Sequence, residues 1–382
     1  MLQLSNSIIK LVKLACFACT LSFLAGCSPQ VLITHSPVQP TSAQNVTYTA
    51  QVAGSGITSV EIWESRYILN GAACDWPHFL GCAVLQSSAL LHTCSYAFTA
   101  SNPSCSYVTT SPYPDGFIIG FKSIAHALDG STGTDGWVYY VAGAPGFFDP
   151  VPIRVSADFA EAIDVVFIAD TDFNGINTDF IAATTNLLNQ GYLSSLPFAQ
   201  HVRPWRGLWN FYVTYQTAHG ATRPCNGVPA NWTSLRAVVD NGVIVHKTPL
   251  RDCAYVGPEN GAMMSVTAGD LPTLLHESGH GVFGVADEYC CDGGYFESSG
   301  IPPQPNVFSS LDHCQTNATS HGWPMTDCTQ FCSFGGQCIP WWRSDDGNDL
   351  MQTGLAGDDY GRSDEIDVYW LYFQRCIRNI GC

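Results

Sequence analysis

Two histidines with a glutamate between them form the part of the sequence best suited to chemistry. They lie in the stretch His276-Glu277-Ser278-Gly279-His280. On an α-helix, positions four apart are separated by about 40° around the axis and about 6 Å along it, so the two imidazoles share a face. Imidazoles at that offset can hold one Zn²⁺ at about 2.0–2.1 Å. Glu277 could then act as a general base, because zinc acidifies a bound water whose proton a carboxylate can accept.

A helix with defined ends must position these residues. Asp270 is suited to cap its N-terminus, and Pro272 fits the first turn. Gly281 and Gly284 follow the second histidine, and glycine tolerates the positive φ that commonly ends a helix. The sequence therefore predicts a helix that starts after Asp270 and breaks within a turn of His280.

Catalytic zinc sites usually have a third protein ligand. If the helix continued, Asp287 would lie about 10.5 Å beyond His280 along the axis, too far for a shared ion. The chain must therefore turn at the glycines, after which either Asp287 or Glu288 can reach the metal. Asp287 is the favoured ligand, and Glu288 is the alternative.

The segment HESGHGVFGVADEY at residues 276–289 resembles the IgA-specific metalloendopeptidase family of zinc peptidases. In that family the HExxH motif is followed by glycine and then by Asp-Glu-Tyr. A weaker resemblance covers residues 160–375. It implies that His276 and His280 are zinc ligands, that Glu277 is the general base and that Asp287 is the third ligand. Gly284 is the fourth residue after His280, whereas metzincins have a glycine at the third position. The resemblance does not establish immunoglobulin as the substrate.

The N-terminus is typical of an export signal. Lys10 and Lys13 precede an apolar run that ends in Leu24-Ala25-Gly26-Cys27. This quartet resembles the bacterial lipoprotein signal, in which the cysteine is lipidated and becomes the new N-terminus. Residues 1–26 are therefore expected to be a signal peptide and Cys27 the lipid anchor, with the protein on the outer membrane or cell surface. An ordinary signal peptide or a signal anchor is the alternative.

The cysteines also favour export. Of 17 cysteines, three fall within or at the end of the signal, and the other 14 form an early group of four and a late group of ten. Even numbers in each group are expected to form disulfides within each half of the chain, in an oxidising compartment. A structural zinc is the alternative for one late cluster, Cys314, Cys328, Cys332 and Cys338.

Composition narrows the class of protein. The chain has 382 residues, enough for two domains, and its formal charge of −17 opposes binding to nucleic acid. The partners expected are a protein or peptide substrate and the membrane, reached through the N-terminal lipid. The protein itself is expected to be a monomer.

The two expected domains differ in their patterns. Residues 27–150 show short strands separated by glycine and proline, with apolar and polar residues alternating over 46–52, which predicts an immunoglobulin-like β-sandwich. Residues 151–382 contain a near-continuous apolar run at 163–169, typical of a buried central strand, and a helical pattern follows over 180–188. We expect an α+β, zincin-like metallopeptidase domain, with a mixed sheet and an active-site helix.

One local prediction in the second domain concerns Asn241-Gly242. Within residues 238–245 this dipeptide separates two short apolar runs and favours a two-residue turn, so the segment is expected to form a hairpin.

Together these features predict an exported, lipid-anchored zinc endopeptidase. Two other readings remain: a surface-anchored binding protein or adhesin whose zinc-peptidase domain is inactive or secondary, and a zinc hydrolase that cleaves another amide. Intact Glu277 argues against an inactive site. Three further residues are open. Met351 either underlies the metal or is a plain core methionine, and Tyr289 and Tyr360 either donate to the reacting oxygen or are structural.

Overall fold

The structure is a computed structural model. It describes most of the chain after the predicted signal peptide. The described residues are 28–69, 83–143, 149–156, 162–194, 208–217, 232–249, 252–256, 262–288, 306–332, 336–345, 350–351, 360–365, 368 and 371.

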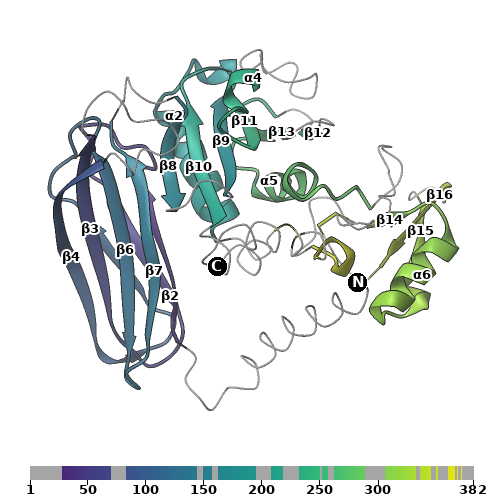
Figure 1. Cartoon of the computed structure of the whole chain (residues 1–382), viewed down its shortest axis with the longest axis horizontal. Coiled ribbons are helices and arrows are strands. Elements are labelled where there is room, and N and C mark those ends of the chain that lie inside the picture. Colours follow the sequence, from purple (N-terminus) through teal and green to yellow (C-terminus); the bar gives the residue numbers. More distant parts are fainter. Residues whose placement is uncertain are drawn as a thin grey trace.

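One large mixed sheet with few helices dominates this mixed α+β structure (Figure 1). Ten strands of the described residues belong to it. In sheet order they are β12 (Cys253–Val256), β13 (Ala262–Thr267), β11 (Asn241–His246), β9 (Ile163–Ala169), β10 (Trp209–Thr214), β8 (Val151–Ser156), β7 (Thr132–Val141), β6 (Ile118–Ala127), β3 (Ile57–Leu69) and β4 (Ala83–Ala100).

The centre of the large sheet is parallel. Strands β13, β11, β9 and β10 run in one direction, whereas β12 and β8 pair with them antiparallel. In β9 every residue except Asp164 is buried, which confirms the central strand predicted from its apolar run. Parallel strands are covered on both faces, and this explains why the sequence of β9 is apolar except at Asp164.

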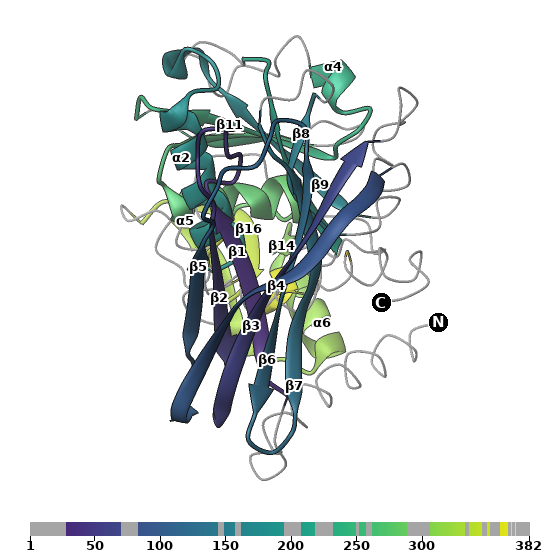
Figure 2. The same ribbon diagram turned by 90° about the vertical axis from the view of Figure 1, so that its left-hand side faces the viewer.

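A second sheet covers the N-terminal part of the large one. It has the order β1 (Gln30–Ser36), β2 (Thr47–Ala53) and β5 (Ser104–Val108). In β2 the side chains of Tyr48, Ala50 and Val52 are buried, which confirms the predicted alternation. These side chains share a core with Phe121 and Tyr140 of the large sheet, so the two sheets pack face to face (Figure 2).

The large sheet spans the domain boundary expected at residue 150. β7, which precedes that residue, pairs with β8, which follows it, with Val138 opposite Ser156 and Tyr139 opposite Val155. The hydrophobic core beneath β9 also includes Leu32 of β1. The described residues on the two sides of the expected domain boundary are therefore joined by one hydrogen-bonded sheet.

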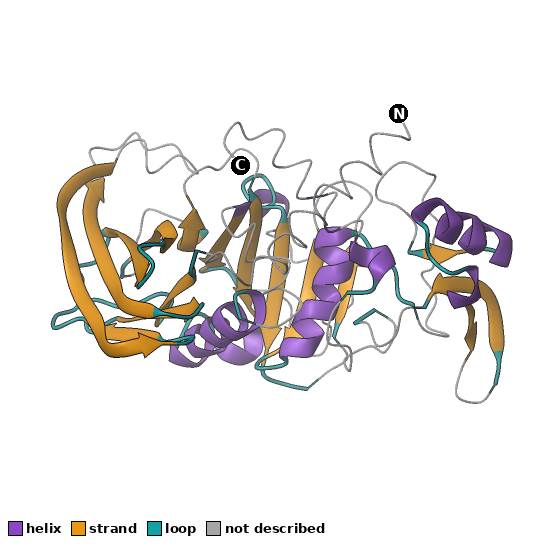
Figure 3. Cartoon of the chain, turned by 90° about the horizontal axis from the view of Figure 1, so that it is seen from below, coloured by secondary structure: helices purple, strands orange, loops and turns teal. Residues whose placement is uncertain are grey.

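Helices pack beside the parallel strands (Figure 3). Gly191 lies against Leu274, and a Cβ at Gly191 would lie 2.8 Å from the leucine side chain, which explains how closely these two helical segments approach. The predicted helix near residues 180–188 is confirmed. The helical segments here are η2 (Thr171–Phe173), α2 (Thr178–Asn186), η3 (Leu187–Tyr192), α4 (Trp232–Leu235), α5 (Leu271–Ser278) and η5 (Gly279–Phe283).

The hairpin predicted at Asn241-Gly242 is wrong. Both residues begin β11, which pairs parallel with β9 and with β13. The glycine serves close packing, because a Cβ at Gly242 would lie 2.6 Å from the Met263 side chain and 3.0 Å from the Trp232 ring. A missing side chain within a strand can reflect such an approach as readily as a turn.

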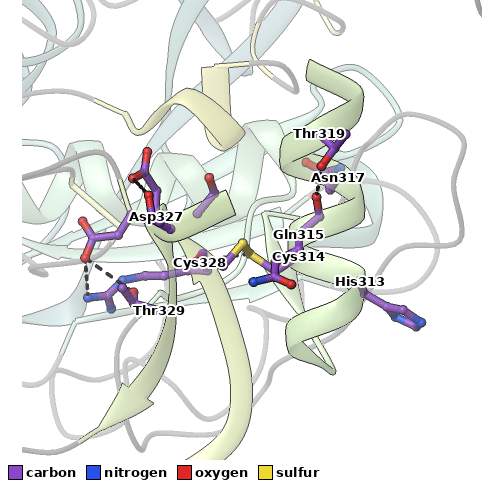
Figure 4. The surroundings of a disulfide bond; sticks show 12 residues. His313, Cys314, Gln315, Asn317, Thr319, Asp327, Cys328 and Thr329 are labelled. Carbon is purple, nitrogen blue, oxygen red and sulfur yellow. Dashed lines mark hydrogen bonds and ion pairs between the residues drawn. A yellow bond between two sulfur atoms is a disulfide. The ribbon is translucent and has the colours of Figure 1, made fainter. Parts of the chain in front are cut away.

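A small unit follows α5 and η5 in the sequence. Its strands β14 (Val307–Phe308), β16 (Cys338–Ser344) and β15 (Cys328–Cys332) form an antiparallel sheet, beside α6 (Leu311–His321) and η6 (Met325–Asp327). One disulfide joins α6 to the start of β15 through Cys314 and Cys328, and His313 points away from it (Figure 4).

The disulfides indicate an extracytoplasmic protein. Three are described, Cys94–Cys105, Cys314–Cys328 and Cys332–Cys338, and each lies within one half of the chain, as predicted. The two late bonds use all four sulfurs of the cluster considered for a structural zinc, so that alternative is wrong. In the part of the chain that the structure describes, no helix has the length and apolar character needed to cross a membrane. Residues 1–26 and Cys27 lie outside the described residues.

Candidate metal centre

The helix that carries the two histidines has the predicted ends. The Asp270 side chain accepts a hydrogen bond of 3.2 Å from the backbone N–H of Thr273, and Pro272 lies in the first turn. After Ser278 the helix continues as the π-helical turn η5 and stops at Gly284, whose φ is 74°. Gly281 lies inside η5, so Gly284 alone ends the helix, because glycine adopts the left-handed conformation without strain.

In both histidines Nδ1 faces a backbone carbonyl, and Nε2 points toward a common position. Nδ1 of His276 lies 3.1 Å from the Leu350 carbonyl, and Nδ1 of His280 lies 2.7 Å from the Val285 carbonyl. A carbonyl can only accept, so each Nδ1 carries a hydrogen and donates it. In the neutral rings each Nε2 therefore presents a lone pair, the state in which imidazole binds a metal.

Asp287 completes the group. Its Oδ1 lies 3.2 Å from Nε2 of His276 and 3.2 Å from Nε2 of His280. Ligand atoms bound tetrahedrally at 2.0–2.2 Å lie about 3.3–3.5 Å apart, so this spacing is close to that of ligands on one zinc ion. Two bare nitrogens facing a carboxylate oxygen also repel it, so the arrangement requires a cation or extra protons at its centre. The donor set of two imidazoles and one carboxylate suits zinc.

The electrostatics of the three side chains are tightly linked. Burial acts to raise the pKa of Asp287, but the two imidazoles outweigh burial and hold that pKa well below its usual range. For His280 burial acts to lower the pKa, and the nearby Asp287 and Glu277 carboxylates raise it overall. These shifts belong to the metal-free state, in which protons on the imidazoles take the place of a cation, and Asp287 is ionised at neutral pH in that state.

The neighbouring acid, Glu288, lies elsewhere. Its side chain is 1% exposed, and Oε1 is 3.3 Å from the side-chain amide of Asn306. The ligand atoms that converge within 4.8 Å of one another are those of His276, His280 and Asp287. Of the two acids left open by the sequence, the structure brings Asp287 to the histidines.

Glu277 lies on the same helix, beside both histidines. It is 6% exposed, and burial raises the pKa of its carboxyl to about 7, although both histidines act in the opposite direction. A buried carboxyl next to a metal centre is placed to exchange a proton with a water there.

Met351 and Tyr360 pack against the helix at Gly279. A Cβ at Gly279 would lie 2.6 Å from the Met351 sulfur and 3.1 Å from the Tyr360 ring, so only glycine fits here. The Tyr360 hydroxyl donates a hydrogen bond of 2.7 Å to the Leu275 carbonyl. Because that proton is already used, Tyr360 has a structural role in this arrangement. Tyr289 lies outside the described residues.

Several contacts of the centre were not found from the sequence. The Leu350 carbonyl orients His276 from a segment 74 residues away. Asn306 contacts the loop of Asp287 across 20 residues. Neither belongs to a motif, and a lone asparagine or a backbone carbonyl has no sequence signal that would reveal it. A second cluster, His92 with Cys94 and Cys105, is excluded as a metal site because its two sulfurs form a disulfide.

Comparisons with known proteins give only distant likenesses. No protein-family model and no curated protein matches the chain. Among solved structures, the sporulation control protein Spo0M from Bacillus subtilis matches with 10% identity and a TM-score of 0.21, over 31% of this chain and 51% of that protein. The chain thus spans about half the length of Spo0M.

Two other solved structures have similar scores. A superoxide reductase (neelaredoxin) from Ignicoccus hospitalis shows 8% identity and a TM-score of 0.21, over 32% of this chain and 85% of that one. A cycloisomaltooligosaccharide glucanotransferase from Paenibacillus sp. shows 12% identity and a TM-score of 0.20, over 85% of this chain and 34% of that one. Scores this low do not establish a shared fold.

Proposed function

We propose that the chain is an exported, lipid-anchored, zinc-dependent endopeptidase that hydrolyses peptide bonds of proteins. The observation that carries the proposal is the contact of Asp287 Oδ1 with Nε2 of both His276 and His280, each at 3.2 Å. The resemblance of HESGHGVFGVADEY to IgA-specific metalloendopeptidases supports the same reading. The finer description of the fold, a zincin-like unit preceded by an immunoglobulin-like sandwich, is part of this proposal.

The roles of the residues follow from their chemistry. His276, His280 and Asp287 would hold the ion. Zinc, when bound, acidifies water and polarises a carbonyl. Glu277 takes the proton from the attacking water and then delivers it to the nitrogen of the leaving amine. Both transfers are general acid–base steps, worth about 10²–10⁴ in rate.

Cleavage of casein by the purified protein tests the proposal. The full-length protein, extracted in detergent, should cleave casein, lose that activity in a chelator and regain it with added zinc. The Glu277→Gln variant, which keeps the shape and zinc ligands but cannot accept a proton, is the matched control. A zinc-loaded protein that cleaves no protein substrate would favour the binding or adhesin reading.

The lipid anchor has its own test. Cys27→Ser should abolish labelling by a fatty-acid probe and release the protein from the membrane fraction, since dual acylation is what makes membrane attachment stable. A Cys27→Ser protein that still carries the label would refute the anchor and leave the peptidase proposal intact.

A further inference from the structure

The segment that carries Asp287 has no regular secondary structure. It runs from Gly284 to Glu288, after the end of η5. Near its start, the N–H of Val285 donates to the Gly279 carbonyl at 3.1 Å. A ligand on such a segment depends on contacts from other parts of the chain, because the segment lacks the hydrogen bonds of a helix or sheet.

Asn306 supplies two of these contacts. Its side-chain Oδ1 accepts a hydrogen bond of 3.0 Å from the N–H of Ala286. Its Nδ2 donates one of 2.7 Å to the carbonyl of the same residue. Asn306 is 3% exposed, so water does not compete for these bonds. The peptide that joins Ala286 to Asp287 is thereby fixed in orientation.

The peptide on the other side of Asp287 is also held. The N–H of Glu288 donates to the Met351 carbonyl at 2.9 Å, and its carbonyl accepts from the Arg343 guanidinium. Asp287 therefore lies between two anchored peptides, one on Asn306 and the other on Met351.

The amide of Asn306 also bears on the choice between the two adjacent acids. Its Nδ2 lies 3.3 Å from Oε1 of Glu288, whose side chain is buried. An N–H donor stabilises a buried carboxylate, so this contact favours Glu288 in the core. Asp287, the residue before Glu288, has its Oδ1 3.2 Å from Nε2 of both histidines.

We propose that Asn306 is a positioning residue that presents Asp287, and not Glu288, to the metal. The inference rests on the proposed zinc centre. Asn306 acts through the loop backbone and touches none of the three ligand side chains in the described contacts. Supporting residues of this kind typically change metal affinity by about 10–100-fold when removed.

The test measures zinc affinity in the full-length protein by competition with a chromophoric chelator. Asn306→Ala should weaken binding by about 10–100-fold. The matched control is Asn210→Ala. Asn210 is also a buried asparagine, whose Oδ1 accepts from the Ser156 N–H at 2.9 Å and whose Nδ2 donates to Asp164 at 3.0 Å, within the sheet. The control should lose stability in the metal-free protein and keep its zinc affinity.

A second variant covers the case in which Asn306→Ala does not fold. Asn306→Asp has nearly the same shape and keeps the acceptor for Ala286, but loses the donor to the Ala286 carbonyl and to Glu288. It should also bind zinc more weakly than the wild type. Wild-type affinity in a folded Asn306 variant, or an equal loss in Asn210→Ala, would overturn the inference. A wild-type protein that binds no zinc would instead refute the proposed function, together with the role of Asn306.

Discussion

Two histidine–aspartate arrangements lie in the same half of the molecule and differ in what they can do. At the candidate metal centre, two imidazoles face one oxygen of Asp287 at 3.2 Å. At the end of β11, His246 alone faces Asp252, with Nε2 2.6 Å from Oδ1 and Nδ1 2.7 Å from the Thr248 carbonyl. The second arrangement is compact enough for a direct hydrogen bond, and the first has the spacing of ligands around an ion.

The number of imidazoles that share one carboxylate oxygen distinguishes the two arrangements. In all three rings Nδ1 faces a backbone carbonyl, so the backbone acceptors are common to both arrangements. Burial acts to lower the pKa of His246, but Asp252 and the Thr248 carbonyl raise it overall. His246 and Asp252 form a one-to-one pair at 2.6 Å, whereas one oxygen of Asp287 is shared by two rings at 3.2 Å, a spacing that suits a cation between them.

The largest effect is expected at Glu277. Glu277→Gln should lower kcat for casein cleavage by about 10²–10⁴ while bound zinc, measured by elemental analysis, stays at the wild-type level. The reason is that glutamine cannot accept the proton of the attacking water. Full activity in this variant would contradict the proposed mechanism even if the zinc content agreed with it.

Breaking the ion pair of His246 and Asp252 should lower the stability of the fold and leave zinc binding unchanged. Asp252→Ala should lower the free energy of unfolding by about 3–5 kcal/mol, because the side chain of His246 is buried and loses its counter-ion. Denaturant titration measures this loss. Zinc binding by the folded variant should be unchanged, and loss of zinc would show that the two arrangements are not independent.

The pH dependence of this pair has a definite sign. The folded-state pKa of His246 is raised, so its contribution to stability is complete below the unfolded value of about 6.5 and is lost as the pH rises through the folded value. Asp252→Asn should remove that part of the pH dependence.

Zinc should stabilise the protein only through the centre formed by His276, His280 and Asp287. At a free concentration of about 100 times Kd, zinc should raise the free energy of unfolding by about 2.7 kcal/mol. This increment should be absent in Asp287→Ala, which loses a ligand, and present in Asp252→Ala. Thermal unfolding with and without zinc compares the two variants, and an increment that persists in Asp287→Ala would show that Asp287 is not a ligand.

His35, which belongs to neither arrangement, gives the smallest effect, with a pH dependence opposite in sign to that of His246. His35 is buried, its ring is stacked on Tyr140 at 4.1 Å, and Nε2 lies 3.0 Å from the Val38 carbonyl. Burial lowers its pKa to about 3. Its contribution to stability is therefore complete above about pH 6.5 and falls as the pH drops, by about 2 kcal/mol at pH 5. His35→Phe keeps the stacking and should lack this acid sensitivity in unfolding measured at pH 5 and 7.

The sequence predicted the parts of the site that depend on neighbouring residues. The cap at Asp270, the end at Gly284 and the shared face of the two histidines all follow from local helix geometry. The central strand β9 was also predictable, since burial on both faces selects a continuous apolar run.

Features that depend on distant contacts could not be predicted. The choice between Asp287 and Glu288 depends on Asn306, which no spacing rule connects to the motif. Asn241-Gly242 favours a turn by local rules, but the role of Gly242 depends on Met263 and Trp232, which approach it only in the folded sheet. Cysteine counts gave the compartment, but the pairs themselves require the three-dimensional distances.

The continuity of the large sheet has a consequence for dissecting the protein. Cutting the chain at residue 150 would separate β7 from β8, which are paired through Val138 and Ser156. Each fragment would then expose an unpaired strand with unsatisfied N–H and C=O groups. The N-terminal fragment would also lose the hydrogen bond from the Val38 N–H to the Thr185 hydroxyl. Such edges template pairing with other chains, so fragments that end here are prone to aggregate. The N-terminal strands of the large sheet therefore belong to the same hydrogen-bonded unit as the parallel strands, and removing them would expose an unpaired edge.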